Sequence, residues 1–202
     1  GHSARDTFEL LLEKGFDMKA KPFAIGVRIQ HPQKMIDESQ YGKKYSKILN
    51  KASYKLTYTT TKKRGVYSFC MCPGGFVVNA SSEEGKLCVN GMSNHDRNEE
   101  NANSAIVVTI TPDDFGLLPL DGINFQRKLE EIAYQKGNTK IPVQLWKDFK
   151  DSKVSKGYEE VKPCIKGDYT FSNLKEILPN YITEAIEEAI PKLIEMLEVE
   201  EM

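Results

Sequence analysis

The chain has 202 residues, 40% of them hydrophobic and 28% charged, a length and composition that predict one globular domain with room for a small subdomain. Its 28 Lys and Arg nearly balance its 29 Asp and Glu, which argues against nucleic-acid or anionic-membrane binding because such proteins usually carry a basic excess. No stretch approaches the roughly 18 apolar residues of a membrane-spanning helix.

The first part of the chain predicts a helix followed by two strands. Ser3 is expected to cap a helix that ends at Gly15. Apolar and polar side chains alternate over residues 22–30, which predicts a half-buried strand, and a second strand is expected at 54–59. The polar stretch 32–49 between them favours short helices.

The middle of the chain predicts further strands. Strands at 66–72 and 76–80 flank Pro73-Gly74-Gly75 and are expected to form a hairpin, because Pro presets the φ of a turn and Gly accepts the positive φ that follows. Two more strands are expected at 86–92 and 105–110, separated by a polar, Asn-rich loop at 93–104.

The last part of the chain predicts helices and one long loop. A helix is expected at 121–137, a surface loop at 150–168, and a helix from Asn180 that gives way to a second at Pro191. The order of these elements predicts the α+β class: a mixed or antiparallel sheet of about six strands, open or barrel-like, with helices at both ends.

Cysteine usage favours a cytoplasmic protein with reduced thiols. Cys70 and Cys72 lie two residues apart in a predicted strand, about 6.5 Å, whereas the Cβ atoms of a disulfide lie about 3.8 Å apart. No secretory signal precedes the helix. The three histidines are scattered singly, so the paired ligands of a zinc site are missing and we predict no metal site.

Familiar nucleotide-binding and hydrolase motifs are absent from the sequence, and four groups of residues remain as candidates for chemistry. No Gly-x-Gly-x-x-Gly, Gly-x-x-x-x-Gly-Lys-Ser/Thr or Gly-x-Ser-x-Gly occurs. The candidates are Gly1-His2-Ser3 at a helix start, Arg28 with His31, Cys70-Met71-Cys72 before Pro73-Gly74-Gly75, and the amides of Asn98, Asn101 and Asn103. Each also has a structural interpretation: a helix cap, a solvent-facing arginine, small buried thiols at a turn, and a solvated loop.

Several long strings in the sequence resemble one family. GHSARDTFELL, KPFAIGVRIQHPQ, RGVYSFCMCPGGFVVNASSEEGKLCVNGMS and ENANSAIVV are similar to the middle portion of a bacterial family of FAD-dependent dehydrogenases. The resemblance is dense over residues 1–149, looser over 150–175, and returns faintly in NLKEILPNYITEAIEEAIP.

This resemblance implies a fragment of a larger flavoprotein. In such proteins the FAD-binding domain is split around an inserted α+β domain, and its Gly-rich loop precedes the region matched here. By that pattern residues 1–20 form a helix at the edge of the FAD-binding domain, 21–165 the inserted substrate-side domain, and 166–202 a helical segment that returns to the flavin domain. Gly1-His2-Ser3 then marks a native junction between the flavin domain and its insert.

The resemblance also implies roles for the candidate residues. The residues expected to face the FAD are His2, Ser3, Cys70, Met71, Cys72, Pro73, Gly74, Gly75, Asn101 and Asn103. Arg28 and His31 are expected to bind an anionic substrate or to place a proton near the reacting carbon. The chain alone is expected to be inactive, with the rest of its flavin domain and a small-molecule substrate as partners.

A non-catalytic ligand- or partner-binding module is the alternative function. Phosphate binding is one form of this alternative, because the chain has two basic clusters, Lys43-Lys44 with Lys47 and Lys62-Lys63-Arg64. The near-zero net charge argues against a nucleic acid as the partner.

Overall fold

The computed structural model describes residues 3–197. Its longer elements are α1 (Arg5–Glu13), β1 (Phe23–Pro32), α2 (Gln33–Tyr45), β3 (Gly65–Cys72), β4 (Gly75–Asn79), β5 (Val89–Ser93), β6 (Asn101–Ile110), α4 (Asp121–Lys136) and α6 (Asn180–Glu195). The shorter elements are β2 (Thr57–Thr59), α3 (Pro112–Phe115), β7 (Ile141–Val143), α5 (Trp146–Lys150), β8 (Ile165–Lys166), β9 (Tyr169–Phe171) and the 3-10 helix η1 (Leu174–Glu176).

The strands of the described residues form three open sheets. The largest is antiparallel in the order β1-β6-β3-β2, the second has the order β5-β4-β8, and the third pairs β7 with β9. Helices stand near both ends of the chain, so the predicted α+β class is confirmed. The single sheet of about six strands that the sequence predicts is instead divided, because β4 pairs with β5 and with β8, apart from the four-stranded sheet.

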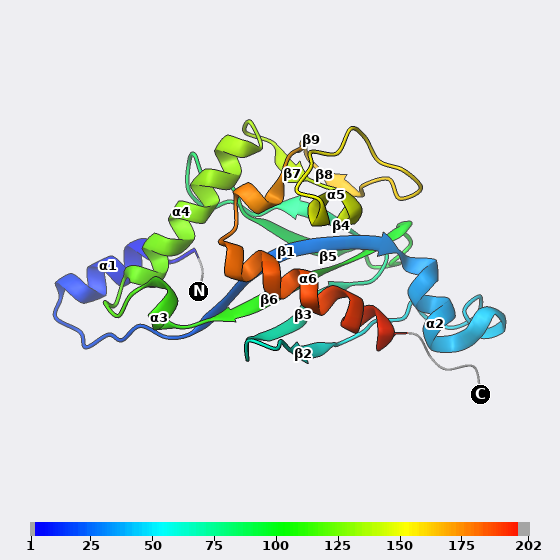
Figure 1. Cartoon of the computed structure of the whole chain (residues 1–202), viewed down its shortest axis with the longest axis horizontal. Helices are drawn as coiled ribbons and strands as arrows, with labels where there is room; N and C mark the ends of the chain where they lie inside the picture. Colours follow the sequence, from blue (N-terminus) through cyan, green and yellow to red (C-terminus); the bar gives the residue numbers. More distant parts are fainter. Residues whose placement is uncertain (1–2, 198–202) are drawn as a thin grey trace.

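The largest sheet owes its main core to alternation along β1 and β6. Ile106, Val108 and Ile110 are at most 1% exposed and pack against α6, which lies across this face of the sheet (Figure 1). Ile182 and Ile186 of α6 are fully buried there. Burial of each such side chain contributes about 1.5–3 kcal/mol. A smaller cluster around Leu87, Ala133, Ile141 and Ile177 joins α4 to the two smaller sheets.

The turn at residues 73–75 does not close a hairpin, and that prediction is wrong. β3 belongs to the four-stranded sheet and β4 to the three-stranded one, so the turn carries the chain from one sheet to the next. Gly74 has φ +45°. A Cβ on Gly74 would lie 1.9 Å from the carbonyl oxygen of Arg97, and one on Gly75 would lie 2.2 Å from that of Met92. Both glycines therefore permit close packing of this chain on itself.

Two further predictions of local structure are wrong. Ala4, not Ser3, is the N-terminal boundary residue of α1, and no side chain caps this helix. Helix α6 continues through Pro191 without a restart. Its buried face, which includes Ile190 and Leu193, spans the proline, so packing outweighs the loss of one backbone hydrogen bond.

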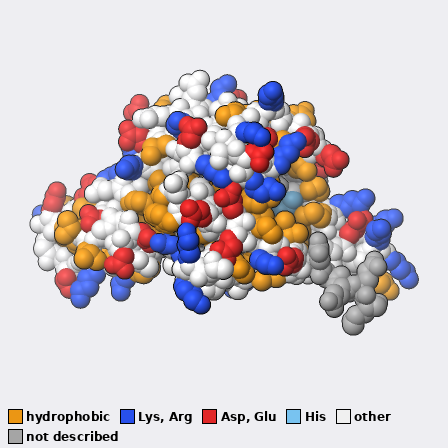
Figure 2. Space-filling view, viewed as in Figure 1, with side chains coloured by type: hydrophobic (Ala, Val, Ile, Leu, Met, Phe, Trp, Pro, Cys, Tyr) orange, Lys and Arg blue, Asp and Glu red, His pale blue; other side chains and the backbone are white. Residues whose placement is uncertain are grey.

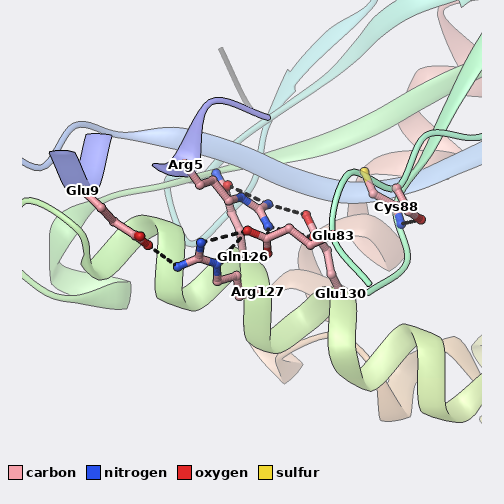
Figure 3. A network of polar contacts seen from close by, with 8 residues as sticks. Arg5, Glu9, Glu83, Cys88, Gln126, Arg127 and Glu130 are labelled. Carbon is pink, nitrogen blue, oxygen red and sulfur yellow. Dashed lines mark hydrogen bonds and ion pairs between the residues drawn. The ribbon is translucent and has the colours of Figure 1, made fainter. Parts of the chain in front are cut away.

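A network of ion pairs attaches α1 to α4 (Figure 3). Arg5 is 1% exposed and donates to Glu130 at 2.6 Å and to Glu83 at 3.0 Å. Arg127 binds Glu83 at 2.8 Å and Glu9 at 2.7 Å. These pairs lower the pKa of Glu83 to about 2, with the Arg127 hydrogen bonds as the largest cause. Arg5 therefore anchors α1 mainly by charge.

Candidate functional site

The Arg28 guanidinium, on β1, joins three segments of the chain. It donates to the Asn103 Oδ1 of β6 at 2.6 Å, to the Cys70 carbonyl oxygen of β3 at 3.2 Å, and to the Asn90 Oδ1 of β5 at 3.1 Å. Gly91 makes room for this arrangement: a Cβ there would lie 2.3 Å from Arg28 Nη1 and 2.1 Å from Asn103 Oδ1. Arg28 thus bridges two sheets, contrary to its interpretation as a simple solvent-facing residue.

The three hydrogen-bond acceptors of Arg28 are neutral, and the Cys72 side chain is a further neighbour of its guanidinium. Within residues 3–197, no carboxylate forms an ion pair with its guanidinium. Burial lowers the pKa of Arg28, and the nearby Cys72 and Cys70 thiols oppose this shift. An arginine remains charged in such surroundings, so the site holds a partly buried positive charge without a negative counterpart in the described chain.

Asn103 lies in the central strand β6, fully buried, and not in a loop. The predicted Asn-rich loop is therefore wrong for residues 101–104. The Asn103 amide oxygen accepts from Arg28, while its Nδ2 has no partner among the described residues. Asn101 is also buried, and its Nδ2 donates to the Lys162 carbonyl oxygen at 2.8 Å. Of these two amides, only Asn103 retains an unused donor.

His31 and Tyr54 form a polar pair three residues along β1 from Arg28, on the opposite face of the strand. His31 Nε2 lies 2.8 Å from the Tyr54 hydroxyl, and their rings lie 5.6 Å apart between centroids. Burial raises the pKa of Tyr54 to about 12, although a hydrogen bond with Ser104 and the Arg28 charge oppose the rise. Burial lowers the pKa of His31, so its imidazole is neutral at pH 7. The pair is neutral at pH 7 and can relay a proton, and an imidazole that takes up a second proton becomes cationic.

The segment from Cys70 to Gly75 is only partly accessible. The register of β3 against β6 shifts between Phe69 and Cys72, and Cys70 has φ +45°. Cys70 and Phe69 are exposed, Met71 and Cys72 are half-buried, and residues 73–75 are buried. The Cys72 thiol donates to the Cys70 carbonyl oxygen at 3.3 Å. All four cysteines are free.

The buried Gln33 side chain holds the turn that follows. Its Oε1 accepts from the Gly74 amide at 2.8 Å, and its Nε2 donates to Asp37 Oδ1 and the Ala52 carbonyl oxygen. Sequence reasoning did not single out Gln33, Asn90 or Tyr54. No local motif marks them, because their contacts with Gly74, Arg28 and His31 join segments far apart in the chain.

A cavity of about 890 Å³ contains the edge of β1 in its wall. Residues 24–31 all line it, so the cavity extends around the edge of β1 to both faces of the strand. Tyr54 and Asn90 line it as well, and the Arg28 and His31 groups therefore border one space. Most of the remaining lining is aliphatic or aromatic, including Trp146. The structure thus brings together Arg28, His31, Asn103 and the Cys70 carbonyl from separate predicted groups.

The other predicted residues have mixed outcomes. His2 lies outside the described residues, and Ser3, exposed just before α1, is among the residues that line the cavity. In the basic clusters, Lys62 pairs with Glu184 at 2.6 Å and Arg64 with Asp114 at 2.6 Å. These pairs reduce the charge that the 62–64 cluster can offer to phosphate.

Two features are absent from the described part of the chain, a metal-binding cluster and a membrane-spanning helix. No three His, Cys, Asp or Glu side chains of residues 3–197 lie close enough together to hold a metal ion. None of the helices in that range is long and apolar enough to cross a membrane.

Comparison with known proteins places this arrangement in a family. Residues 22–199 match the family described as FAD-dependent protein, C-terminal domain-like, and the chain belongs to it. It is 54% identical over 195 residues to an uncharacterized protein of Clostridium beijerinckii. The match covers 94% of this chain and 37% of that relative, so the chain spans little more than a third of the relative's length.

Proposed function

We propose that this chain forms the substrate-side domain of an FAD-dependent oxidoreductase of the dehydrogenase type. Membership of an FAD-dependent family supports this function. The 37% coverage of the Clostridium beijerinckii relative leaves ample chain for a flavin-binding part in the same polypeptide. The chain alone is inactive in this proposal, and its four free cysteines suit the reducing cytoplasm.

The unpaired charge of Arg28 is the observation that carries the proposal. A dehydrogenase must hold its substrate in one orientation beside the cofactor, and a guanidinium binds anionic groups with directional hydrogen bonds. Arg28 is already positioned by Asn103, Asn90 and the Cys70 carbonyl. It therefore binds the anionic group of the substrate, and His31 with Tyr54 accepts or supplies a proton at a neighbouring atom.

The residues near Arg28 fit a flavin only as one wall of its site. Bound FAD would exchange the hydride with the substrate. Cys70 and Phe69 are exposed, so a flavin carried by another part of the protein can reach them. The Cβ positions of Gly74 and Gly75 are filled by this chain, which leaves little room for a flat ring against them. This domain would position the substrate and exclude water while the remaining protein holds the FAD phosphates.

The ends of the chain complete the flavin domain in this proposal. Leu10 and Phe16, in and after α1, are 51% and 60% exposed, and apolar side chains are visible at this end of the molecule in Figure 2. Exposed apolar groups of this size often mark an interface. In this proposal residues 1–20 and 166–202 lead to the flavin-binding part, while α6, within 166–202, also packs on the main sheet of the inserted domain, 21–165.

Purification of the complete polypeptide tests the function. A flavin absorption spectrum that bleaches on reduction and returns in air is expected. A colourless protein that does not take up added FAD would exclude the proposal. As a matched pair, Arg28→Lys and Arg28→Gln should both retain flavin, whereas turnover of an anionic substrate should fall more in the Gln variant because that variant lacks the charge.

A further inference from the structure

The cavity beside β1 has the size and lining of a small-molecule site. Its volume of about 890 Å³ falls within the roughly 300–1,000 Å³ typical of ligand pockets. Its walls are mainly aliphatic or aromatic. They include Ile25, Trp146 and Ile186 on the face of β1 that α6 covers, and Val77, Val89 and Ile165 of the β5-β4-β8 sheet on the face to which Arg28 points. Such a lining favours a ligand with an apolar body.

The charges at the cavity wall differ in how they are satisfied. Among its described lining residues, the acidic and basic side chains, apart from the neutral His31, are those of Glu130 and Arg28. Glu130 binds Arg5 at 2.6 Å, whereas Arg28 contacts only neutral acceptors. Asn103, which accepts from Arg28, also keeps a buried Nδ2 without a partner in the described chain. The Arg28 guanidinium is therefore the charged group at this wall that can form an ion pair with a ligand.

We propose that this cavity binds a carboxylate attached to an aliphatic or aromatic body. The carboxylate pairs with the Arg28 guanidinium, and the apolar body lies among the aliphatic side chains of the β5-β4-β8 sheet, which faces Arg28. This inference rests on the proposed function, because it names the substrate class of the same site. A charge-assisted contact of this kind is stronger than a neutral hydrogen bond and selects the acid over its neutral analogues.

Trp146 gives a direct measure of binding in the isolated chain. It is the only tryptophan in the sequence and it lines the cavity. Octanoate is titrated while Trp146 fluorescence is recorded, with octanamide and acetate as comparison probes. The amide keeps the apolar body without the charge, and acetate keeps the charge without the body. Saturable binding is expected for octanoate, with Kd values at least about tenfold weaker for the other two probes.

Two variants test the role of the charge. Arg28→Gln removes it, and Asn90→Asp places an internal carboxylate where the Asn90 Oδ1 now lies 3.1 Å from Arg28 Nη2. Either change should weaken octanoate binding at least about tenfold and leave octanamide binding unchanged. Arg97→Gln is the matched control, because it removes the same charge from an exposed position in the neighbouring loop. Circular dichroism and urea unfolding establish that each variant is folded.

The inference is overturned if octanoate does not bind, if octanamide binds equally well, or if Arg28→Gln and Asn90→Asp both bind octanoate like the unaltered chain. It is also overturned if octanoate binds the isolated chain but not the complete protein, because the cavity would then be covered by another domain. These measurements need no flavin. Failure to bind octanoate therefore excludes the ligand class, whereas failure to bind FAD in the complete protein excludes the proposed function.

Discussion

Replacing Glu83 by Gln should destabilise the protein in a pH-dependent way. The Glu83 carboxylate accepts from Arg127 Nε and Nη2 and from Arg5 Nη1, at 2.8 to 3.1 Å. These contacts lower its pKa from 4.5 to about 2. Because the pKa is lower in the folded state, the ionised form stabilises that state. The stabilisation is complete above the unfolded pKa of 4.5 and is lost as the pH falls from there towards 2.

The shift sets the size of the effect. At about 1.4 kcal/mol per pKa unit, the ion pairs of Glu83 contribute at most about 3.5 kcal/mol at pH 7 and about 2 kcal/mol at pH 3.5. Glu83→Gln keeps the shape and a hydrogen-bonding oxygen but removes the charge. Its loss of unfolding free energy should therefore be about 1 to 1.5 kcal/mol smaller at pH 3.5 than at pH 7.

Urea unfolding at both pH values, followed by circular dichroism, measures this difference. Glu84→Gln is a suitable control because it neutralises the adjacent carboxylate, for which the structure shows no ion pair in the described range. Equal destabilisation by Glu83→Gln at the two pH values would refute the electrostatic reasoning, and so would an equal effect of Glu84→Gln at pH 7.

Three further predictions concern the site. Gly91→Ala should lower the free energy of unfolding in urea by about 1–3 kcal/mol and weaken octanoate binding, because the added Cβ would displace the Arg28 guanidinium. Unchanged binding would contradict the packing described. Gln33→Leu should lower the free energy of unfolding by about 2–4 kcal/mol, because it leaves the buried Gly74 amide without its acceptor. A loss below about 1 kcal/mol would show that the turn does not depend on the Gln33 side chain. Cys70→Ser should change unfolding free energy by less than about 0.5 kcal/mol, because the residue is exposed. Slower flavin reduction in the complete protein carrying that variant would therefore indicate a redox thiol, and unchanged turnover a structural one.

The parts of the fold that depend on local pattern were predictable from the sequence. Alternation over residues 22–30 matches β1 at Phe23–Pro32, and the polar stretch around Gly42 forms α2 with a kink at that glycine. The turn at residues 73–75 was also predictable, because proline and glycine determine local backbone angles. The sheets to which its two flanking strands belong were not, since that choice depends on partners far along the chain.

The candidate site shows the same division. Arg28 stands out in the sequence as the one charge on an apolar strand, and the structure places it at the centre of the polar group. Asn103 looks like a loop residue because its neighbours in sequence are polar. Its burial becomes favourable only through the Arg28 side chain on the adjacent strand. Tyr54 and Asn90 carry no local signal, because each gains its significance from a partner on another segment.

The position of β1 at the edge of its sheet has a consequence for biosynthesis. Its neighbour in that sheet is β6, and the face that both strands present is covered by α6, near the end of the described chain. The ribosome therefore synthesises β1 long before its sheet neighbour β6 and the covering helix α6. The apolar row of β1 consists of Phe23, Ile25, Val27 and Ile29. Until α6 emerges, the nascent chain carries an uncovered apolar strand, which is a feature that chaperones bind and that promotes aggregation of truncated products.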